Sequence, residues 1–426
     1  MARWLYEPTK RAVDLLVALA LLPIAAPVAT MALAIARRGL RPRLAATPCV
    51  GRDGRRFERL REVLADEGSR LAGLADWPVL LAVVAGHVSL VGPRILSVEE
   101  AAALDAAEHD RFKVRPGLLC YWWLQQRAHI DFDREADADR RYLRQRSLRA
   151  DLSILARSLL AMPYGSNDGR RTAAVHIGGI RLLNLGMDDL VAAIEAALQG
   201  RSSTQIAFVN PACVNIAAVD PRYRAALAHA DWVCPDGIGM KIAGRILGRP
   251  IRQNLNGTDL FPRLCESLAA SGQRLYLLGA RPGVAEATAR WAQQRFPRLR
   301  VAGTRSGYFD ARDEEAVIAG IRRSGADVLL VAMGVPAQDL WLRRHLKKTG
   351  AHVGIGVGGL FDFYGGRIPR APMWLREIGG EWIYRLIQEP RRMWRRYLIG
   401  NFTFLYRIAR ERVSPAASSG SQRWMH

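Results

Sequence analysis

The feature that most constrains the fold is an alternation of short apolar segments with amphipathic segments between residues 175 and 360. The apolar segments have the length of buried strands, and the amphipathic ones have helical periodicity. The pattern predicts strands at 205–210, 231–234, 274–279, 299–303, 327–333 and 352–357, and helices at 189–198, 221–230, 284–295 and 314–323. Such alternation predicts an α/β fold, a Rossmann-like parallel sheet with helices on both faces, which binds ligands at the carboxyl ends of its strands.

Polar or glycine-rich clusters follow the expected strand ends. They are Asn210-Pro211, Pro235-Asp236-Gly237-Ile238-Gly239, Gly279–Gly283 and Gly334–Asp339, and the turn Asn256-Gly257-Thr258-Asp259 begins a helix that Thr258 or Asp259 can cap. The segment after Gly279 opens a helix, so its backbone amides suit an anion. Each cluster alone also fits an ordinary turn or helix start. Their order and spacing together indicate a binding site.

The last predicted strand leads into a glycine-rich segment, residues 356–372, that contains Gly358, Gly359, Asp362, Arg367 and Arg370. Glycine lets the backbone approach a ligand closely, and arginine supplies a planar cationic fork. The segment therefore suits a phosphate or pyrophosphate. We call residues 356–372 the glycine hook.

The composition indicates anionic partners. The chain has 426 residues, enough for two or three domains, and a net charge of +22. Nucleic acid is the second choice of partner, and no helix-turn-helix, zinc or RNA-binding motif supports it. The five cysteines are scattered along the sequence and form no CxxC pair. This distribution favours a reducing compartment and argues against a disulfide framework or a zinc site.

Residues 15–36 carry no charge and lie within an apolar segment, residues 12–36, that we expect to associate with a membrane. Because Pro23 and Pro27 interrupt helical hydrogen bonds, the segment can be either a kinked transmembrane helix or a re-entrant hairpin. The alternative to membrane contact is a buried core helix. Nine arginines between Arg37 and Arg61 place the next loop in the cytoplasm by the positive-inside tendency.

The C-terminal part, residues 371–412, is basic and aromatic. Eleven arginines and five acids occur between residues 360 and 413, interleaved with tryptophan, tyrosine and phenylalanine. This pattern suits a helix on anionic lipid, and a solvated basic face over an aromatic core is the alternative. Residues 413–426 are rich in Ser, Ala and Gly and are predicted to be a disordered tail.

The motif order resembles the WecG/TagA/CpsF family of glycosyltransferases over about residues 175–410. The resemblance rests on the clusters above together with Leu277-Leu278-Gly279, Gly307-Tyr308-Phe309, the glycine hook and Glu381-Trp382-Ile383-Tyr384-Arg385. The resemblance implies an inverting, metal-independent transfer of a sugar from a UDP-sugar to a polyprenyl-pyrophosphate-linked saccharide. It places the catalytic domain, residues 175–370, on the cytoplasmic side of a bacterial inner membrane, in exopolysaccharide or other cell-surface polysaccharide synthesis.

The same resemblance assigns roles to residues. Asp236 falls on the catalytic base, and the substrate-binding positions are Asn210, Gly237, Asn256, Asp259, Gly279, Gln338, Asp339, Gly358, Gly359 and Asp362. The positions expected to hold the acceptor pyrophosphate or the membrane are Arg367, Arg370, Arg376, Arg385, Arg391 and Arg392. Phe208, Asn254 and Asp339 replace the family's usual Thr, Arg and Glu. The donor sugar therefore stays open among UDP-glucose, UDP-N-acetylmannosamine and its uronic acid, with a hexose preferred.

A second resemblance covers about residues 8–165. The domain predicted there comprises residues 1–164, and a predicted linker at 165–174 follows it. Lys10-Arg11 with Asp14, Ser89–Arg94 and Arg115-Pro116-Gly117 are similar to bacterial sugar transferases that move a phosphosugar onto polyprenyl phosphate. That family uses an adjacent Asp-Glu pair, the Glu holding Mg²⁺; here the pair is Ala75-Asp76. We expect a mainly helical, degenerate domain that anchors the chain or binds the lipid acceptor.

Three functional hypotheses follow. The first is a glycosyltransferase that elongates a lipid-linked sugar without a cofactor or metal. The second is a bifunctional enzyme whose N-terminal domain also primes the lipid with Mg²⁺, using Asp76 as a shifted nucleophile. The third is a non-enzymatic membrane scaffold for other polysaccharide assembly enzymes.

Overall fold

The computed structural model describes residues 3–37, 44–62, 76–128, 135–161, 172–201 and 203–413. By its internal contacts the chain forms two compact units. The first comprises Met1–Arg170 with Arg376–Ile378, and the second comprises Arg171–Leu375 with Gly379–His426. The predicted linker lies mostly, and the predicted tail almost wholly, outside the described residues.

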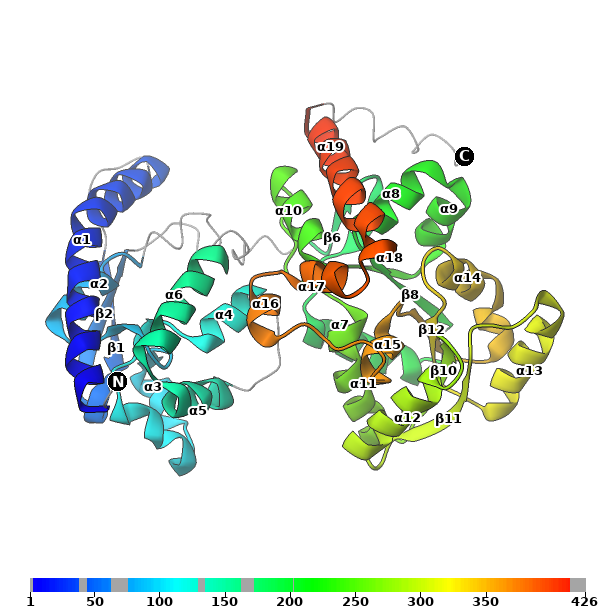
Figure 1. Ribbon diagram of the computed structural model, residues 1–426, viewed down its shortest axis with the longest axis horizontal. Helices are drawn as coiled ribbons and strands as arrows, with labels where there is room; N and C mark the ends of the chain where they lie inside the picture. Colours follow the sequence, from blue (N-terminus) through cyan, green and yellow to red (C-terminus); the bar gives the residue numbers. More distant parts are fainter. Residues whose placement is uncertain are drawn as a thin grey trace. The chain divides into compact units, whose positions relative to one another are not determined.

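The first unit combines helices with two small sheets (Figure 1). Its helices are α1 (Arg3–Arg37), α2 (Val79–Ala85), α3 (Val98–Ala102), α4 (Tyr121–Ala128), α5 (Glu135–Gln145) and α6 (Leu148–Ala161), with short 3-10 segments η1 (Arg52–Gly54) and η2 (Ala106–Lys113). One sheet has the order β2 (Arg56–Glu62), β1 (Leu44–Val50), β4 (Leu96–Ser97), and the other pairs β3 (Ser89–Val91) with β5 (Gly117–Leu119). The arginine-rich segment after Arg37 was predicted as a loop, and most of it is the antiparallel β1–β2 pair.

Helix α1 is continuous through Pro8, Pro23 and Pro27. Its first half packs on the first unit: Asp14, which is buried, accepts hydrogen bonds from the Ser89 hydroxyl (2.6 Å) and the Leu90 amide (3.1 Å). Beyond Ala18 the apolar side chains are largely exposed, among them Leu19, Ile24, Val28 and Met31. Helix α1 is long and apolar enough to cross a membrane, which by itself is weak evidence that it does.

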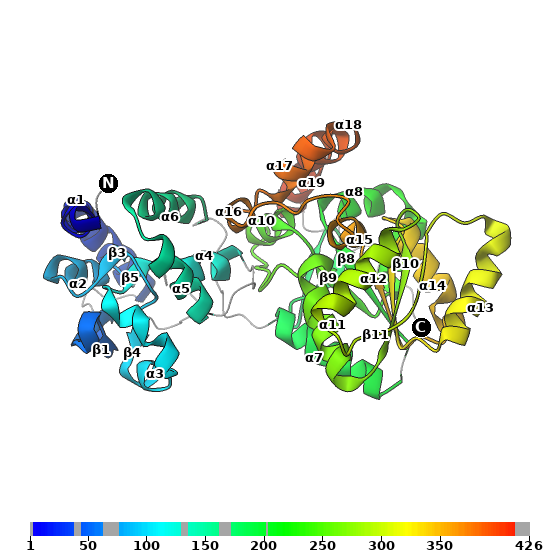
Figure 2. The same cartoon turned by 60° about the horizontal axis from the view of Figure 1, so that its bottom comes forward.

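The second unit contains the predicted parallel sheet (Figures 1 and 2). The six strands, in spatial order, are β11 (Arg300–Arg305), β10 (Arg274–Gly279), β12 (Val328–Ala332), β13 (Val353–Gly356), β8 (Thr204–Val209) and β9 (Trp232–Pro235). All neighbours are parallel. An antiparallel pair, β6 (Ala174–Ile177) and β7 (Ile180–Leu183), precedes the sheet and is absent from the sequence prediction.

Helices cover both faces of this sheet, as predicted. The helices before residue 360 are α7 (Met187–Gln199), α8 (Pro211–Val219), α9 (Pro221–His229), α10 (Ile238–Ile246), α11 (Gly257–Ser271), α12 (Val284–Arg295), α13 (Glu314–Ser324) and α14 (Ala337–Thr349), with the 3-10 turn η4 (Ala311–Asp313). Alternate strand residues face opposite sides, so Leu275 and Leu277 pack with α7, α11 and α12, whereas Tyr276 and Leu278 pack with α13 and α14. Figure 2 shows α12 and α14 on opposite sides of the strands. Burial on both faces explains why the strands read as continuous apolar runs.

Apart from Arg376–Ile378, the chain after the sheet belongs to the second unit. It forms α15 (Leu360–Tyr364), α16 (Met373–Glu377), α17 (Glu381–Gln388), α18 (Pro390–Trp394), the π-helical turn η5 (Arg395–Ile399) and α19 (Gly400–Val413). Phe404 and Ile408 of α19 are fully buried in a cluster with α8 and α10. This packing anchors the basic C-terminal part, which we call the appendage, to the predicted catalytic domain.

Candidate active site

Asn210 and Asp236 meet at the carboxyl edge of the sheet. The strands β8 and β9 end in register at Val209 and Pro235, and the Asp236 amide donates to the Val209 carbonyl (2.8 Å). Asn210 caps helix α8, because its Oδ1 accepts from the amides of Ala212 and Cys213. That leaves the Asn210 amide group to hydrogen-bond the carboxyl of Asp236. The two residues therefore lie side by side at the ends of β8 and β9.

The environment of Asp236 makes it a weaker acid than usual. Burial raises the pKa of its carboxyl to about 6, the hydrogen bond from Asn210 and the charge of Arg396 lower it, and the charges of Glu381 and Asp259 raise it. Asp236 is therefore ionised at neutral pH and binds a proton more readily than an exposed aspartate. Both properties suit a general base.

Asn254 holds the turn that presents Asp236. Gly237 has a φ of 88°, and its amide donates to the Asn254 Oδ1 (2.5 Å). The neighbouring amide of Leu255 donates to the Pro235 carbonyl (2.9 Å). Asn254, which replaces the family's usual arginine, thus accepts a backbone hydrogen bond from the Asp236–Gly237 turn.

The predicted substrate-binding residues Asn256 and Asp259 contact each other and an arginine of the glycine hook. The Asn256 side chain accepts from the Asp259 amide (2.8 Å) and donates to its Oδ2 (2.7 Å). The Arg370 Nη2 donates to the Asp259 Oδ1 (2.6 Å), and its Nε lies 3.4 Å from the Glu381 Oε1. Arg370, predicted to bind the acceptor pyrophosphate, is therefore paired with two carboxylates in this structure.

Gln338 connects helix α14 to the glycine hook, and Asp339 lies behind it. The Gln338 Oε1 accepts from the Gly358 amide (2.9 Å). Asp339 is 0% exposed, and burial raises the pKa of its carboxyl to about 7, while interaction with the Tyr223 hydroxyl lowers it. A Cβ on Gly356 would lie within 2.8 Å of both side chains, so glycine is needed there. Asp339 is therefore buried behind Gln338, and only Gln338 is hydrogen-bonded to the glycine hook.

Gly279 brings two strand ends unusually close. It has a φ of 135°, and a Cβ there would lie 2.5 Å from the Ala332 carbonyl oxygen. The loop after β11 is fixed to the same place, since the amide of Gly307 donates to the Ala280 carbonyl (3.0 Å). The helices after β10 and β12 leave in opposite directions along the sheet, which makes this a topological switch point where α/β sheets bind ligands. Tyr308, which is 72% exposed, stands in this loop.

The arginines of the glycine hook and the appendage differ in their partners. Arg367 pairs with Asp362 (2.8 Å), and Arg392 pairs with Glu389 (3.1 Å). Arg385 lies over the Phe363 ring and beside Gly359, where a Cβ would be 2.6 Å from its Nη2.

Two predicted arginines have other surroundings. Arg391 is exposed on α18. Arg376 is buried and belongs by its contacts to the first unit, so the structure does not group it with the others.

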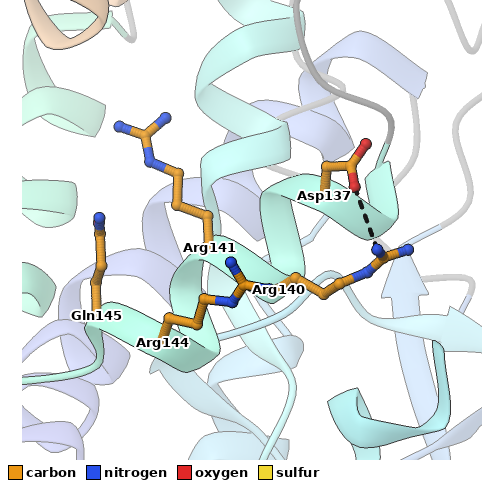
Figure 3. Close-up of a pocket in the computed structure, with 5 residues that line it drawn as sticks. All are labelled: Asp137, Arg140, Arg141, Arg144 and Gln145. Atoms are coloured by element: carbon orange, nitrogen blue, oxygen red, sulfur yellow. Dashed lines mark ion pairs between the residues drawn. The ribbon is translucent and has the colours of Figure 1, made fainter. Parts of the chain in front are cut away.

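The first unit offers a different kind of polar surface. Figure 3 shows an open pocket on helix α5 whose side chains are Asp137, Arg140, Arg141, Arg144 and Gln145. Arg140 pairs with Asp137 (3.6 Å), and Arg141 lies over the Tyr121 ring. None of the predicted site residues lines this pocket. Among the described residues, no group of three or more His, Cys, Asp or Glu side chains is arranged to hold a metal ion.

Comparison with known families agrees with the geometry of the second unit. The model of the glycosyl transferase WecG/TagA/CpsF family matches residues 175–418. The chain belongs to this family. It is therefore a glycosyltransferase, and its match covers the sheet, Asp236, the glycine hook and the appendage.

Two relatives illustrate the likeness. An N-acetylglucosaminyldiphosphoundecaprenol N-acetyl-beta-D-mannosaminyltransferase of Bacillus spizizenii is 34% identical over 193 residues, covering 45% of this chain and 74% of the relative. A protein of the same name from Staphylococcus aureus is 32% identical over 241 residues, covering 56% and 93%.

The bacterial sugar transferase model matches residues 69–164, a shorter stretch than the resemblance over residues 8–165 suggested. Ala75 lies outside the described residues. Asp76 is paired with Arg59 (2.9 Å) and lies 3.6 Å from Arg61, both on β2. The Asp76 carboxylate therefore has two arginine partners in this structure.

Sequence reasoning missed several residues of this glycosyltransferase's site. Glu381, Arg396 and Tyr397 of the appendage interact electrostatically with Asp236 or with each other. They lie some 150 residues away in sequence, so no local pattern groups them with the base. The Glu381 motif was the one available signal. No sequence signal indicated Tyr223, which faces Asp339 from α9.

Proposed function

We propose that this enzyme is a membrane-associated inverting glycosyltransferase that moves a sugar from a UDP-sugar to a polyprenyl-pyrophosphate-linked saccharide. The observation that carries the proposal is the Asn210–Asp236 pair at the carboxyl edge of the sheet, with the Asp236 pKa near 6. The names of the relatives support the lipid-linked acceptor and favour an N-acetylhexosamine, such as N-acetylmannosamine, over the hexose preferred from sequence.

In the proposed reaction Asp236 takes the proton of an acceptor hydroxyl as its oxygen attacks the anomeric carbon. The new glycosidic bond forms on the face opposite the breaking bond to the UDP phosphate, so the configuration inverts. UDP departs with the bonding electron pair, and Asp236 later releases the proton to water. General-base catalysis of this kind contributes typically about 10²–10⁴-fold.

The proposal assigns charge stabilisation to arginine and requires no metal or other cofactor. Arg385 lies beside Gly359, where the hook turns, and Arg391 and Arg396 are also in the appendage. Guanidinium groups form charge-assisted hydrogen bonds with phosphate oxygens and can stabilise both departing UDP and the acceptor pyrophosphate. Arg367, Arg370 and Arg392 have carboxylate partners at 2.6–3.1 Å and would have to exchange them for phosphate, whereas the partner of Arg385, Glu389, lies at 4.0 Å.

The fold of the first unit supports attachment to one face of a membrane. The Asp14 region of α1 is fixed to β3, and Leu44, the first residue of β1 in the same unit, comes only seven positions after Arg37. Seven residues span at most about 25 Å. A helix that crossed the bilayer completely would separate β1 from the unit to which it belongs. We therefore favour a re-entrant or surface-lying α1, on the cytoplasmic side of a bacterial inner membrane.

The appendage offers a second membrane contact on the second unit. Ile387 of α17, Ile399 of η5 and Phe402 and Tyr406 of α19 are exposed, the phenylalanine by 77%. Apolar side chains beside arginines suit an interface with anionic lipid. This contact would bring the lipid-linked acceptor to the edge of the sheet that carries Asp236.

The test uses full-length protein in nanodiscs with a panel of UDP-sugars and either polyprenyl phosphate or polyprenyl-pyrophosphate-linked N-acetylglucosamine. We expect UDP release only with the pyrophosphate-linked acceptor, without added metal, and a loss of about 10²-fold or more in kcat for Asp236→Asn. Transfer by Asp236→Asn at the wild-type rate would refute the assigned base. Release of UMP with bare polyprenyl phosphate when Mg²⁺ is added, abolished by Asp76→Ala, would show that the N-terminal domain is active as well.

A further inference from the structure

Glu381 opens helix α17 and joins the appendage to the sheet domain. Arg370, at the end of the glycine hook, lies between two carboxylates: its Nη2 is 2.6 Å from the Asp259 Oδ1, and its Nε is 3.4 Å from the Glu381 Oε1. Asp259 is in turn fixed by Asn256 at the start of α11. The chain Asp259–Arg370–Glu381 thus ties the first turn of α17 to the first turn of α11.

This tie occurs next to the proposed base. Asp236 experiences the charges of Glu381 from α17, Arg396 from η5 and Asp259 from α11, besides its hydrogen bond with Asn210. Tyr397 of η5 interacts with Asp236 and Glu381 as well, and its ring lies 6.0 Å from that of Trp382. The start of α17 therefore contacts η5 through these two rings. Gly379, two residues before Glu381, also lies against Ile238, two residues after Asp236, since a Cβ there would be 3.1 Å from the Ile238 Cγ1.

We propose that Glu381 is a positioning residue with two roles. Through its contact with Arg370 it holds the appendage to α11. Together with Arg396 it also places one negative and one positive charge of the appendage near Asp236. The inference rests on the function proposed above, since it takes Asp236 as the base. It gives the appendage a role in the proton transfer itself, in addition to any contact with lipid or pyrophosphate.

The two charges have opposite effects on the base. Glu381 raises the pKa of Asp236 and Arg396 lowers it. Losing the Glu381 charge should extend activity to lower pH, and losing the Arg396 charge should restrict it to higher pH. A residue with a purely structural role would lower activity equally at every pH.

The experiment measures kcat/KM for the lipid-linked acceptor between about pH 5 and pH 9, because this parameter reports the ionisation of the free enzyme. The full-length protein in nanodiscs is supplied with UDP-N-acetylmannosamine and polyprenyl-pyrophosphate-linked N-acetylglucosamine. With a wild-type pKa near 6, about a tenth of Asp236 is ionised at pH 5, so complete reversal of its shift would raise activity there by at most about tenfold. We expect Glu381→Gln to raise activity at pH 5, relative to its own plateau, by roughly two- to threefold.

Three variants complete the design. Glu381→Asp keeps the charge and should restore the wild-type acid limb, and Arg396→Gln should move that limb to higher pH. Glu315→Gln removes an exposed carboxylate on α13 and should leave the profile unchanged. If Glu381→Gln does not fold, the direction in which Arg396→Gln shifts the acid limb still tests whether the appendage charges act on Asp236.

The outcomes separate the inference from the proposed function. If Asp236→Asn abolishes transfer but neither appendage variant moves the acid limb, the inference is wrong and the assigned base stands. If Asp236→Asn remains fully active, the proposed base is wrong and the inference falls with it. Opposite shifts for Glu381→Gln and Arg396→Gln support both.

Discussion

Replacing Asp339 by asparagine is expected to stabilise the second unit at pH 8 and much less at pH 5. The carboxyl is fully buried, and neither oxygen has a well-formed hydrogen bond among the described residues. Burial raises its pKa from 3.8 to about 7 in the folded chain. Between these values the unfolded chain releases the proton and the folded chain keeps it, so the free energy of unfolding falls as the pH rises through this window.

The size of the effect follows from the two pKa values. At pH 8 the full difference of about three units applies, which at 1.36 kcal/mol per unit is at most about 4 kcal/mol. At pH 5 only about one unit applies, or roughly 1.5 kcal/mol. The advantage of Asp339→Asn should therefore grow by about 2–3 kcal/mol between pH 5 and pH 8. Any packing cost of the amide is independent of pH and cancels in this comparison.

Thermal unfolding of the full-length protein in detergent, followed by circular dichroism at the two pH values, measures this difference. An increment of that size corresponds to about 5–10 °C in Tm for a unit of this length. Asp310→Asn removes an exposed carboxylate and serves as the control, with no pH-dependent gain expected. Parallel Tm profiles for wild type and Asp339→Asn would show that Asp339 is ionised as readily in the folded chain as in the unfolded one.

Two further predictions concern the switch point and the appendage. Gly279→Ala should destabilise the second unit by about 3 kcal/mol or more, because its Cβ would meet the backbone of Ala332, whereas Gly320→Ala, with open space around it on α13, should be neutral or slightly stabilising in the same melting assay. Phe402→Glu should raise KM for a long-chain lipid acceptor by about threefold to tenfold and leave KM for a short-chain soluble analogue unchanged, while Phe402→Leu should behave as wild type. Equal effects on both acceptors would place Phe402 outside any lipid contact.

Most strands of the sheet were predictable because they are buried on both faces, whereas the edge strand β11 is only partly buried. The strand expected at residues 274–279 and the helix expected at residues 284–295 coincide with β10 and α12. The sequence predicted a ligand site at the carboxyl ends of the strands, and Asn210 and Asp236 follow the ends of β8 and β9 at that edge. The two hairpins were missed for different reasons. Most of β1 is exposed and most of β2 is charged, so neither reads as an apolar run. The strands β6 and β7 have only four residues each.

Long-range polar contacts lay beyond the sequence pattern. A list of charges shows that Arg370 and Asp259 are present, but the 111 residues between them hide that they form an ion pair. The same holds for Glu381 and Asp236, which come together only when the appendage folds back through the burial of Phe404 and Ile408. Pairing and desolvation decide how a charge acts, and both are properties of the tertiary structure.

The arginines of the glycine hook and the appendage show what this means for ligand binding. Arg367 and Arg370 come before α17, and their partners Asp362 and Asp259 make the hook rigid. Arg391 and Arg395 lie after α17, and neither forms an ion pair with another described residue. An arginine with a carboxylate partner must lose that partner to bind phosphate, and an unpaired one loses only water. The paired arginines are thus better suited to shape the site, and the unpaired ones to receive the pyrophosphate or the lipid surface.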